Sequence, residues 1–109
     1  MPRFIITGNY TQAAAKGMLA HPSDRGAATG ALIEAAGGTM EAFYATTGPT
    51  DFIIIATTDD VTDIIASLIV AGASGAASNL QTQRAFTSEE LLAMQKKAVD
   101  LAAAYSPPG

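Results

Sequence analysis

The stretch FYATTGPTDFIIIATT, residues 43–58, decides the fold of this 109-residue chain. Within it, residues 52–56 are an unbroken apolar run rich in isoleucine, and β-branched side chains favour a strand over a helix. Gly48 and Pro49 mark a turn just upstream, because proline cannot donate to a β-ladder and belongs in a loop or at a strand end. Since the apolar run does not alternate with polar residues, we expect both faces of this strand to be buried.

The residues that precede the turn predict a second strand at 39–46, because Thr, Phe and Tyr favour the pleated conformation. Two strands joined by about four residues form a hairpin. Asp51 stands where the loop enters the buried strand. Two interpretations of this carboxylate stay open: it caps the turn by accepting hydrogen bonds from backbone N–H groups, or it is a catalytic group at the mouth of a cavity.

Capping residues, glycines and the spacing of apolar residues predict the other elements. Strands are expected at 3–10 and 78–86, and helices at 12–19, from Ser23 or Asp24 to about 36, at 61–71, and from 88 to about 104. The order β-α-β-β-α-β-α predicts an α+β fold, namely a ferredoxin-like βαββαβ plait with an additional C-terminal helix.

A plait of this kind carries helices on one face of its sheet only, so the bare face needs cover. Two bare sheets that pack together form a dimeric α+β barrel, which would bury the second face of strand 52–56. The composition agrees, because charged residues make up 15% of the chain against the usual quarter. We therefore expect one domain at 1–105, paired as a homodimer or a higher homo-oligomer, and a flexible tail at 106–109.

Composition also excludes several classes of protein. The net charge is −4 and the six basic residues are scattered, so the chain lacks the basic patch of a nucleic-acid-binding protein. There is no cysteine, which excludes disulfides, thiolate metal sites and thiol nucleophiles. No apolar stretch reaches the roughly 18 residues of a membrane helix, and the first residues run into a strand, so we expect no signal peptide. We expect a cytoplasmic protein with neither a nucleic-acid nor a membrane partner.

A set of residues between 1 and 90 forms a recognisable pattern. It comprises Gly8-Asn9-Tyr10-Thr11, Lys16, Pro22, Arg25, Gly37-Gly38, Phe43-Tyr44, Gly48, Asp51 and Thr82-Gln83-Arg84-Ala85-Phe86-Thr87. In this pattern the chain resembles the GYD domain family, which takes its name from a Gly-x-Tyr-Asp-like turn before an apolar strand. Thr50 stands where that turn has tyrosine, so the resemblance implies no role for a phenol there. It implies the dimeric α+β-barrel fold and assigns no activity.

His21 is the only histidine, and it precedes a proline at a break between two helices. Such a residue is typical of a surface loop, but its ordinary pKa of about 6.5 also suits a catalytic general base. Asp24 and Asp51 are the carboxylates that could join it around a metal ion. No H-x-H or H-x₃-H spacing exists, so we predict neither a metal site nor a cofactor.

Lys16 and Arg25 lie on either side of the same helix break. Together with Tyr10 they are candidates to bind a carboxylate or phosphate, although the alternative is that both cations lie on solvated helix faces. Tyr44 and Arg84 come from strands, and with Tyr10 they are expected to line the inner face of the sheet. There they would orient a ligand or pack in an interface.

Two functions remain in view. The first is a small-molecule-binding protein, or a cofactor-free enzyme, with a cavity between sheet and helices for a mostly apolar or anionic molecule. The residues expected to line that cavity or give it polarity are Tyr10, Phe43, Tyr44, Ile53, Lys16, His21, Arg25 and Asp51. The alternative is an assembly module whose sheet face is filled by the partner subunit. Whether the protein is an enzyme is left open.

Overall fold

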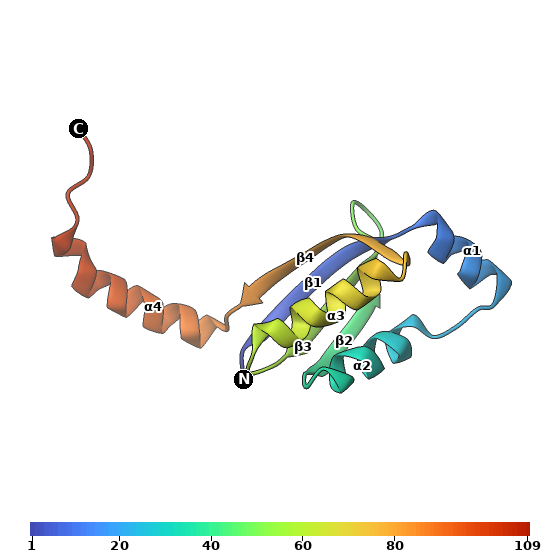
Figure 1. Cartoon of the computed structure of the whole chain (residues 1–109). Coiled ribbons are helices and arrows are strands. Elements are labelled where there is room, and N and C mark those ends of the chain that lie inside the picture. Colours follow the sequence, from blue (N-terminus) through green and yellow to red (C-terminus); the bar gives the residue numbers. More distant parts are fainter.

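The computed structural model describes residues 1–109 as four strands and their connecting helices (Figure 1). In chain order the elements are β1 (Arg3–Tyr10), α1 (Gln12–Ala20), α2 (Arg25–Ala35), β2 (Thr39–Ala45), β3 (Phe52–Thr57), α3 (Val61–Ala73), β4 (Ala77–Ala85), α4 (Ser88–Leu101) and a short 3₁₀ helix (Ala102–Ala104). The strands pair antiparallel in the order β2-β3-β1-β4. This is the predicted ferredoxin-like plait with a C-terminal helix, and the α+β fold is therefore confirmed.

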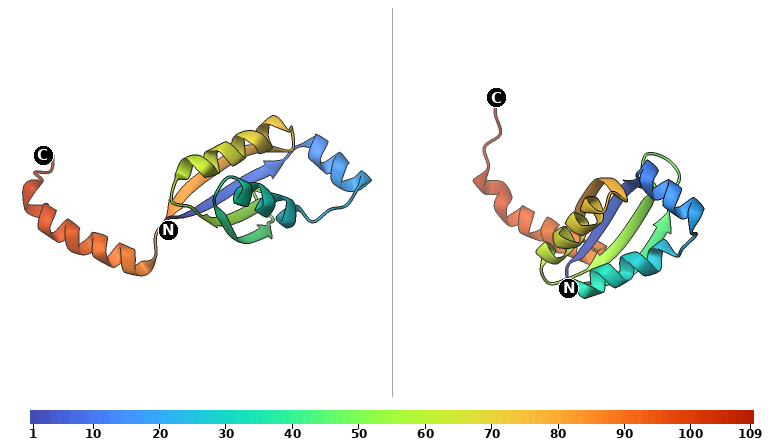
Figure 2. Two further views of the ribbon diagram at one scale, coloured as in Figure 1. Left: turned by 60° about the horizontal axis from the view of Figure 1, so that its bottom comes forward. Right: turned by 45° about the vertical axis from the view of Figure 1, so that its right-hand side comes forward.

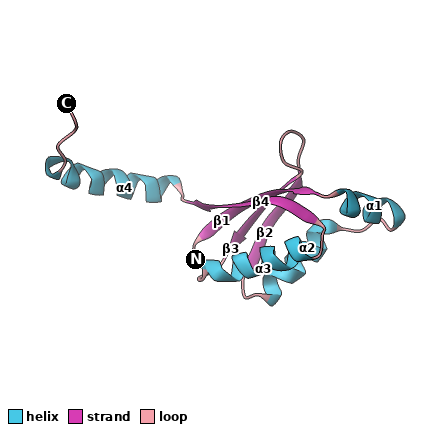
Figure 3. Cartoon of the chain, turned by 45° about the horizontal axis from the view of Figure 1, so that its top comes forward, coloured by secondary structure: helices cyan, strands magenta, loops and turns pink.

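Helices α2 and α3 cover one face of the sheet (Figure 3). Side chains point to alternate faces along a strand, so every second residue of β1 and β3 faces these helices. The buried residues of the core are Phe4, Ile6, Ile33, Phe52, Ile54, Ala56 and Ile64. All but two of them come from β1 and β3, so these two central strands contribute most of the core.

The opposite face of the sheet has no cover within the chain. Ile5 pairs with Ile55, and Thr7 pairs with Ile53, on this open face. All four are only half-buried. The expectation that β3 is buried on both faces is therefore not met within a single chain, because α2 and α3 both lie on the other side of the sheet.

Helix α4 projects away from the sheet at the end of β4 (Figures 1 and 2). It begins with the predicted capping box: the Glu90 N–H donates to Thr87 Oγ1 at 3.1 Å, and the Thr87 N–H donates to Glu90 Oε1 at 2.9 Å. Its apolar side chains are exposed: Leu91, Leu92, Met94, Val99 and Leu101. None of the helices is both long enough and apolar enough to cross a membrane.

Two glycine substitutions should change stability in opposite directions. A methyl group at Gly8 would lie 2.7 Å from Phe52 Cζ and 2.8 Å from Leu80 Cδ2, so Gly8→Ala should lower the free energy of unfolding by about 1–3 kcal/mol. Gly17 lies inside α1 with open space around it, so Gly17→Ala should raise that free energy by about 0.5–1 kcal/mol. Urea unfolding measures both; an equal effect of the two variants would contradict the packing described for β1.

Candidate functional site

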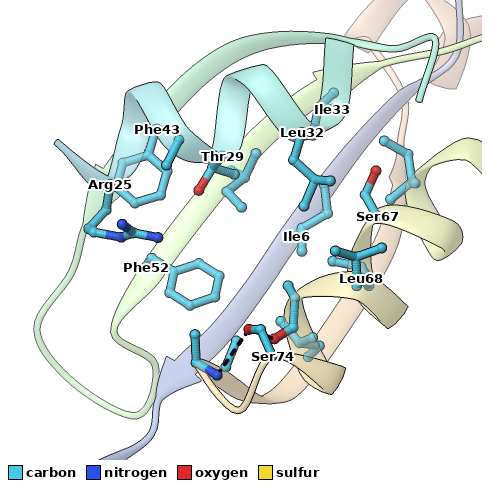
Figure 4. Close-up of a pocket in the computed structure, with 18 of the residues that line it drawn as sticks. Ile6, Arg25, Thr29, Leu32, Ile33, Phe43, Phe52, Ser67, Leu68 and Ser74 are labelled. Atoms are coloured by element: carbon cyan, nitrogen blue, oxygen red, sulfur yellow. Dashed lines mark hydrogen bonds between the residues drawn. The ribbon is translucent and has the colours of Figure 1, made fainter. Parts of the chain in front are cut away.

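A cavity of about 200 Å³ lies between the helix-covered face of the sheet, α2 and α3 (Figure 4). Ile6 and Phe52 line it from the sheet, Leu32 from α2 and Leu68 from α3. Fifteen of its 19 lining residues are hydrophobic, so a molecule inside it would be held mainly by apolar contact. An engineered apolar cavity of roughly 150 Å³ in another protein binds benzene, which shows that this size is enough for a small molecule.

Small side chains explain why this space is not filled. The cavity is lined by Ala28 on α2, by Ala71 and Ser74 at the end of α3, and by Ala76 and Ala77 at the start of β4. Larger apolar residues at these positions would fill much of the space between helices and sheet. The cavity therefore follows from small residues on α2, at the end of α3 and at the start of β4.

Arg25 and Thr29 bring polar groups from α2 to this mainly apolar cavity. They are separated by four residues on α2 and therefore share one face of the helix. The Arg25 guanidinium donates one hydrogen bond to Ser23 Oγ at 3.1 Å and has no carboxylate within ion-pair distance. Thr29 makes no side-chain hydrogen bond within the chain. Figure 4 shows both side chains on the same side of the cavity as Phe43 and Phe52.

Tyr10, at the end of β1, brings a phenol to the cavity. Its ring packs against Phe52 with centroids 5.1 Å apart. Burial raises the pKa of the Tyr10 phenol above its ordinary value; the nearby Arg25 charge opposes this shift, and Asp51 adds to it. The phenol therefore stays neutral at pH 7 and remains a hydrogen-bond donor.

Asp51 holds the end of β1 in place. The Tyr10 N–H donates to Asp51 Oδ2 at 2.9 Å, and the Asp51 N–H donates to the Gly8 carbonyl at 2.8 Å. The carboxylate thus accepts a backbone hydrogen bond, as the capping interpretation expects, but from a neighbouring strand and not from its own turn. A catalytic role for Asp51 stays a prediction.

A second hollow of about 280 Å³ adjoins Tyr10 and Arg25 on the side of α1. His21 lines it and caps the C-terminus of α1, where its N–H donates to the Gly17 carbonyl at 2.9 Å. The structure therefore brings Tyr10, His21 and Arg25 together, although they come from three different segments. Lys16 is exposed on α1 and lines neither hollow. Binding by Lys16 and catalysis by His21 stay predictions.

Tyr44 and Ile53 do not line the cavity, and their expected placement there is wrong. They pair with each other on the open face of the sheet, where Tyr44 is 60% exposed. The reason is the two-residue period of a strand: Phe43 lines the cavity, so its neighbour Tyr44 must face the other way.

Arg84 lies at the opposite end of the sheet from Tyr10. It pairs with Phe4, six residues before Tyr10 on β1, which corresponds to about 20 Å along the strand. Its guanidinium stacks over the Phe86 ring at 4.3 Å and approaches Glu90 at 3.9 Å. Arg84 therefore joins β4 to the start of α4 and cannot contact a ligand that binds at Tyr10.

Thr29 and the alanines of the cavity are the functional candidates that sequence reasoning missed. The four-residue spacing of Arg25 and Thr29 is the signal that could have found Thr29. The alanines carry no signal of their own, because an unfilled space depends on how helices and sheet meet. Nowhere in the chain do three or more His, Asp or Glu side chains come close enough to hold a metal ion.

Comparison with known proteins adds the following. The GYD domain pattern matches residues 4–94. The protein TTHA0845 from Thermus thermophilus has a similar structure with a TM-score of 0.52 and 17% identity, over 81% of this chain and 96% of that one. The transcriptional regulator NMB0573 from Neisseria meningitidis, solved in complex with L-Met, also gives 0.52 at 16% identity, over 80% of this chain and 51% of the regulator. No curated protein matches the sequence. At these identities the structural similarity shows the fold alone.

Removing the Asp51 carboxylate should loosen the end of β1. Asp51→Ala leaves the part-buried Tyr10 N–H without an acceptor and should lower the free energy of unfolding by about 1–3 kcal/mol. Asp51→Asn keeps an oxygen at that place and should cost less than about 1 kcal/mol. Asp59→Ala, at an exposed carboxylate, is the matched control in urea unfolding. Equal stabilities of Asp51→Ala and the control would show that the carboxylate does not hold β1.

Proposed function

The chain belongs to the GYD domain family, and on that premise we propose that it binds a small, mostly apolar or anionic molecule in the cavity between its sheet and helices. The observation that carries this proposal is the mainly hydrophobic cavity of about 200 Å³, with Tyr10, Arg25 and Thr29 among its lining residues. A mostly apolar pocket with a few convergent polar groups is the usual form of a small-molecule site. The similar Neisseria meningitidis regulator was solved with L-Met, so small-molecule binding is known for a protein with this fold.

Conversion of the bound molecule is a further step of this proposal. His21 lines the hollow that shares Tyr10 and Arg25 with the cavity, and an imidazole there would be the group to move a proton. Asp51 reaches the same region only through the Tyr10 backbone. The arrangement therefore supports binding more strongly than catalysis.

Benzene tests the cavity without testing its polar side. We expect millimolar benzene to shift the methyl NMR signals of Ile6, Leu32 and Leu68, which line the cavity. Ala71→Leu should abolish these shifts, because its larger side chain would occupy the space that benzene needs. Ala66→Leu changes an exposed residue of the same helix and should leave them intact. If benzene shifts no cavity methyl in the unaltered protein, the cavity is not a binding site.

A second candidate function is self-assembly through the open face of the sheet. The centre of that face is uncharged: Ile5, Thr7, Ala42, Ile53 and Ile55. The charged pair at its edge, Arg3 and Glu41, is satisfied internally, with Arg3 Nε 2.9 Å from Glu41 Oε2. We propose that a second copy of the chain covers this face, as a homodimer or within a higher homo-oligomer. The ligand cavity lies on the other face, so binding and assembly do not exclude each other.

A charge on the open face should abolish this assembly. Light scattering of the unaltered protein should give at least twice the 11.1 kDa mass of one chain. Ile55→Glu would place a carboxylate in the centre of the apolar face and should reduce the mass to that of one chain. Leu19→Glu, at a residue of α1 that is 85% exposed, should leave the assembly intact. A mass of 11.1 kDa for the unaltered protein at micromolar concentration would refute self-assembly.

A further inference from the structure

Arg25 is the cation in this chain that most needs a partner. Arg3 pairs with Glu41, and Arg84 lies near Glu90. Arg25 is half-buried beside the cavity and donates only to Ser23 Oγ, a neutral group. A charge that is withdrawn from water without an opposite charge is unfavourable. An anion at this place would relieve that cost.

Resting on the proposed function, we infer that the ligand is a monocarboxylate with an apolar tail of about six or seven carbons. Its carboxylate lies between Arg25 and Tyr10, and its tail fills the cavity toward Ile6 and Leu68.

The size of the tail follows from the cavity. One methylene group occupies about the volume of one water molecule in the liquid, roughly 30 Å³. The cavity of about 200 Å³ therefore holds six to seven carbons. Its lining from the sheet and the two helices is mainly hydrophobic, and the hydroxyls of Ser67 and Ser74 already donate to the Asp63 and Ala71 carbonyls. This lining disfavours a tail that carries several hydroxyl groups, as sugars and other polyols do.

The head group follows from the donors around Arg25. A guanidinium presents paired N–H groups that match the two oxygens of a carboxylate. The neutral phenol of Tyr10 and the unbonded hydroxyl of Thr29 can each donate one further hydrogen bond. Tyr10 and Arg25 line both the cavity and the adjoining hollow, so a single molecule can place its tail in the cavity and its head beside these two residues.

The charge of the head group follows from the neighbouring residues. Asp24 caps α2 directly before Arg25 and accepts from the Ala27 N–H, and Asp51 accepts from the Tyr10 N–H. Lys16 lines neither hollow. The guanidinium of Arg25 can neutralise one negative charge. A phosphate dianion carries two, and its second charge would be repelled by the carboxylates of Asp24 and Asp51. The surroundings therefore favour a monocarboxylate over a phosphate ester.

Octanoate and 1-octanol separate the head group from the tail. Octanoate has a tail of seven carbons and 1-octanol a tail of eight, so their tails differ by one carbon, and at pH 7 only octanoate is charged. We expect calorimetric titration of the unaltered protein to show octanoate binding at least about tenfold more tightly than 1-octanol, because hydrogen bonds between charged groups are the stronger ones. Equal affinities, or tighter binding of octyl phosphate, would overturn the inference.

Variants test whether Arg25 causes the difference in affinity between octanoate and 1-octanol. Arg25→Gln should weaken octanoate about tenfold or more and change 1-octanol less than about twofold. Tyr10→Phe should weaken octanoate about fivefold. Arg84→Gln, at the far end of the sheet, should change neither ligand. Octanoate binding that is unaffected by Arg25→Gln would overturn the assignment, and the comparison of ligands on the unaltered protein does not depend on how any variant folds.

The outcome also separates this inference from the proposed function. If benzene binds in the cavity but octanoate does not bind more tightly than 1-octanol, the monocarboxylate is rejected and the cavity remains a binding site. If benzene, 1-octanol and octanoate all fail to bind, both proposals are rejected.

Discussion

The two-residue period of β1 and β3 is the constraint on which this structure depends. Because neighbouring side chains point to opposite faces, Phe4 and Ile6 enter the core while Ile5 and Thr7 lie on the open face. Both sets are largely apolar, but α2 and α3 cover only one of them. One face of the sheet is therefore covered by helices and the other is uncovered, and a cavity lies on the covered face where Ala28 and Ala71 contribute little side-chain volume.

Much of the fold could be predicted because local signals agree with it. The capping box of Thr87 and Glu90, the helix break at His21 and Pro22, and the isoleucine run of β3 each determine one element. The wrong prediction concerns faces: Phe43 and Tyr44 cannot both line the cavity, because adjacent residues of one strand do not share a face.

The candidate site was predictable only in part. Tyr10 and Arg25 could be chosen by residue type, but their meeting depends on how the end of β1 lies beside the start of α2. Asp51, in the β2–β3 loop, helps to hold the end of β1 in place, because its carboxylate accepts a hydrogen bond from the Tyr10 N–H, 41 positions away in sequence. The cavity itself arises because the side chains of Ala28 and Ala71 are small. No residue pattern shows this before the packing of helices against the sheet is known.

The side chains on the two faces of strand β1 belong to two different surfaces, the cavity and the open face of the sheet. Ile6 borders the cavity, and the residues on either side of it, Ile5 and Thr7, belong to the open face. A ligand that moved β1 would therefore displace the surface proposed to pack against a second copy. Thermodynamic linkage then requires reciprocity: any factor by which occupancy strengthens association is the factor by which association strengthens occupancy. Protein concentration would become a determinant of ligand affinity.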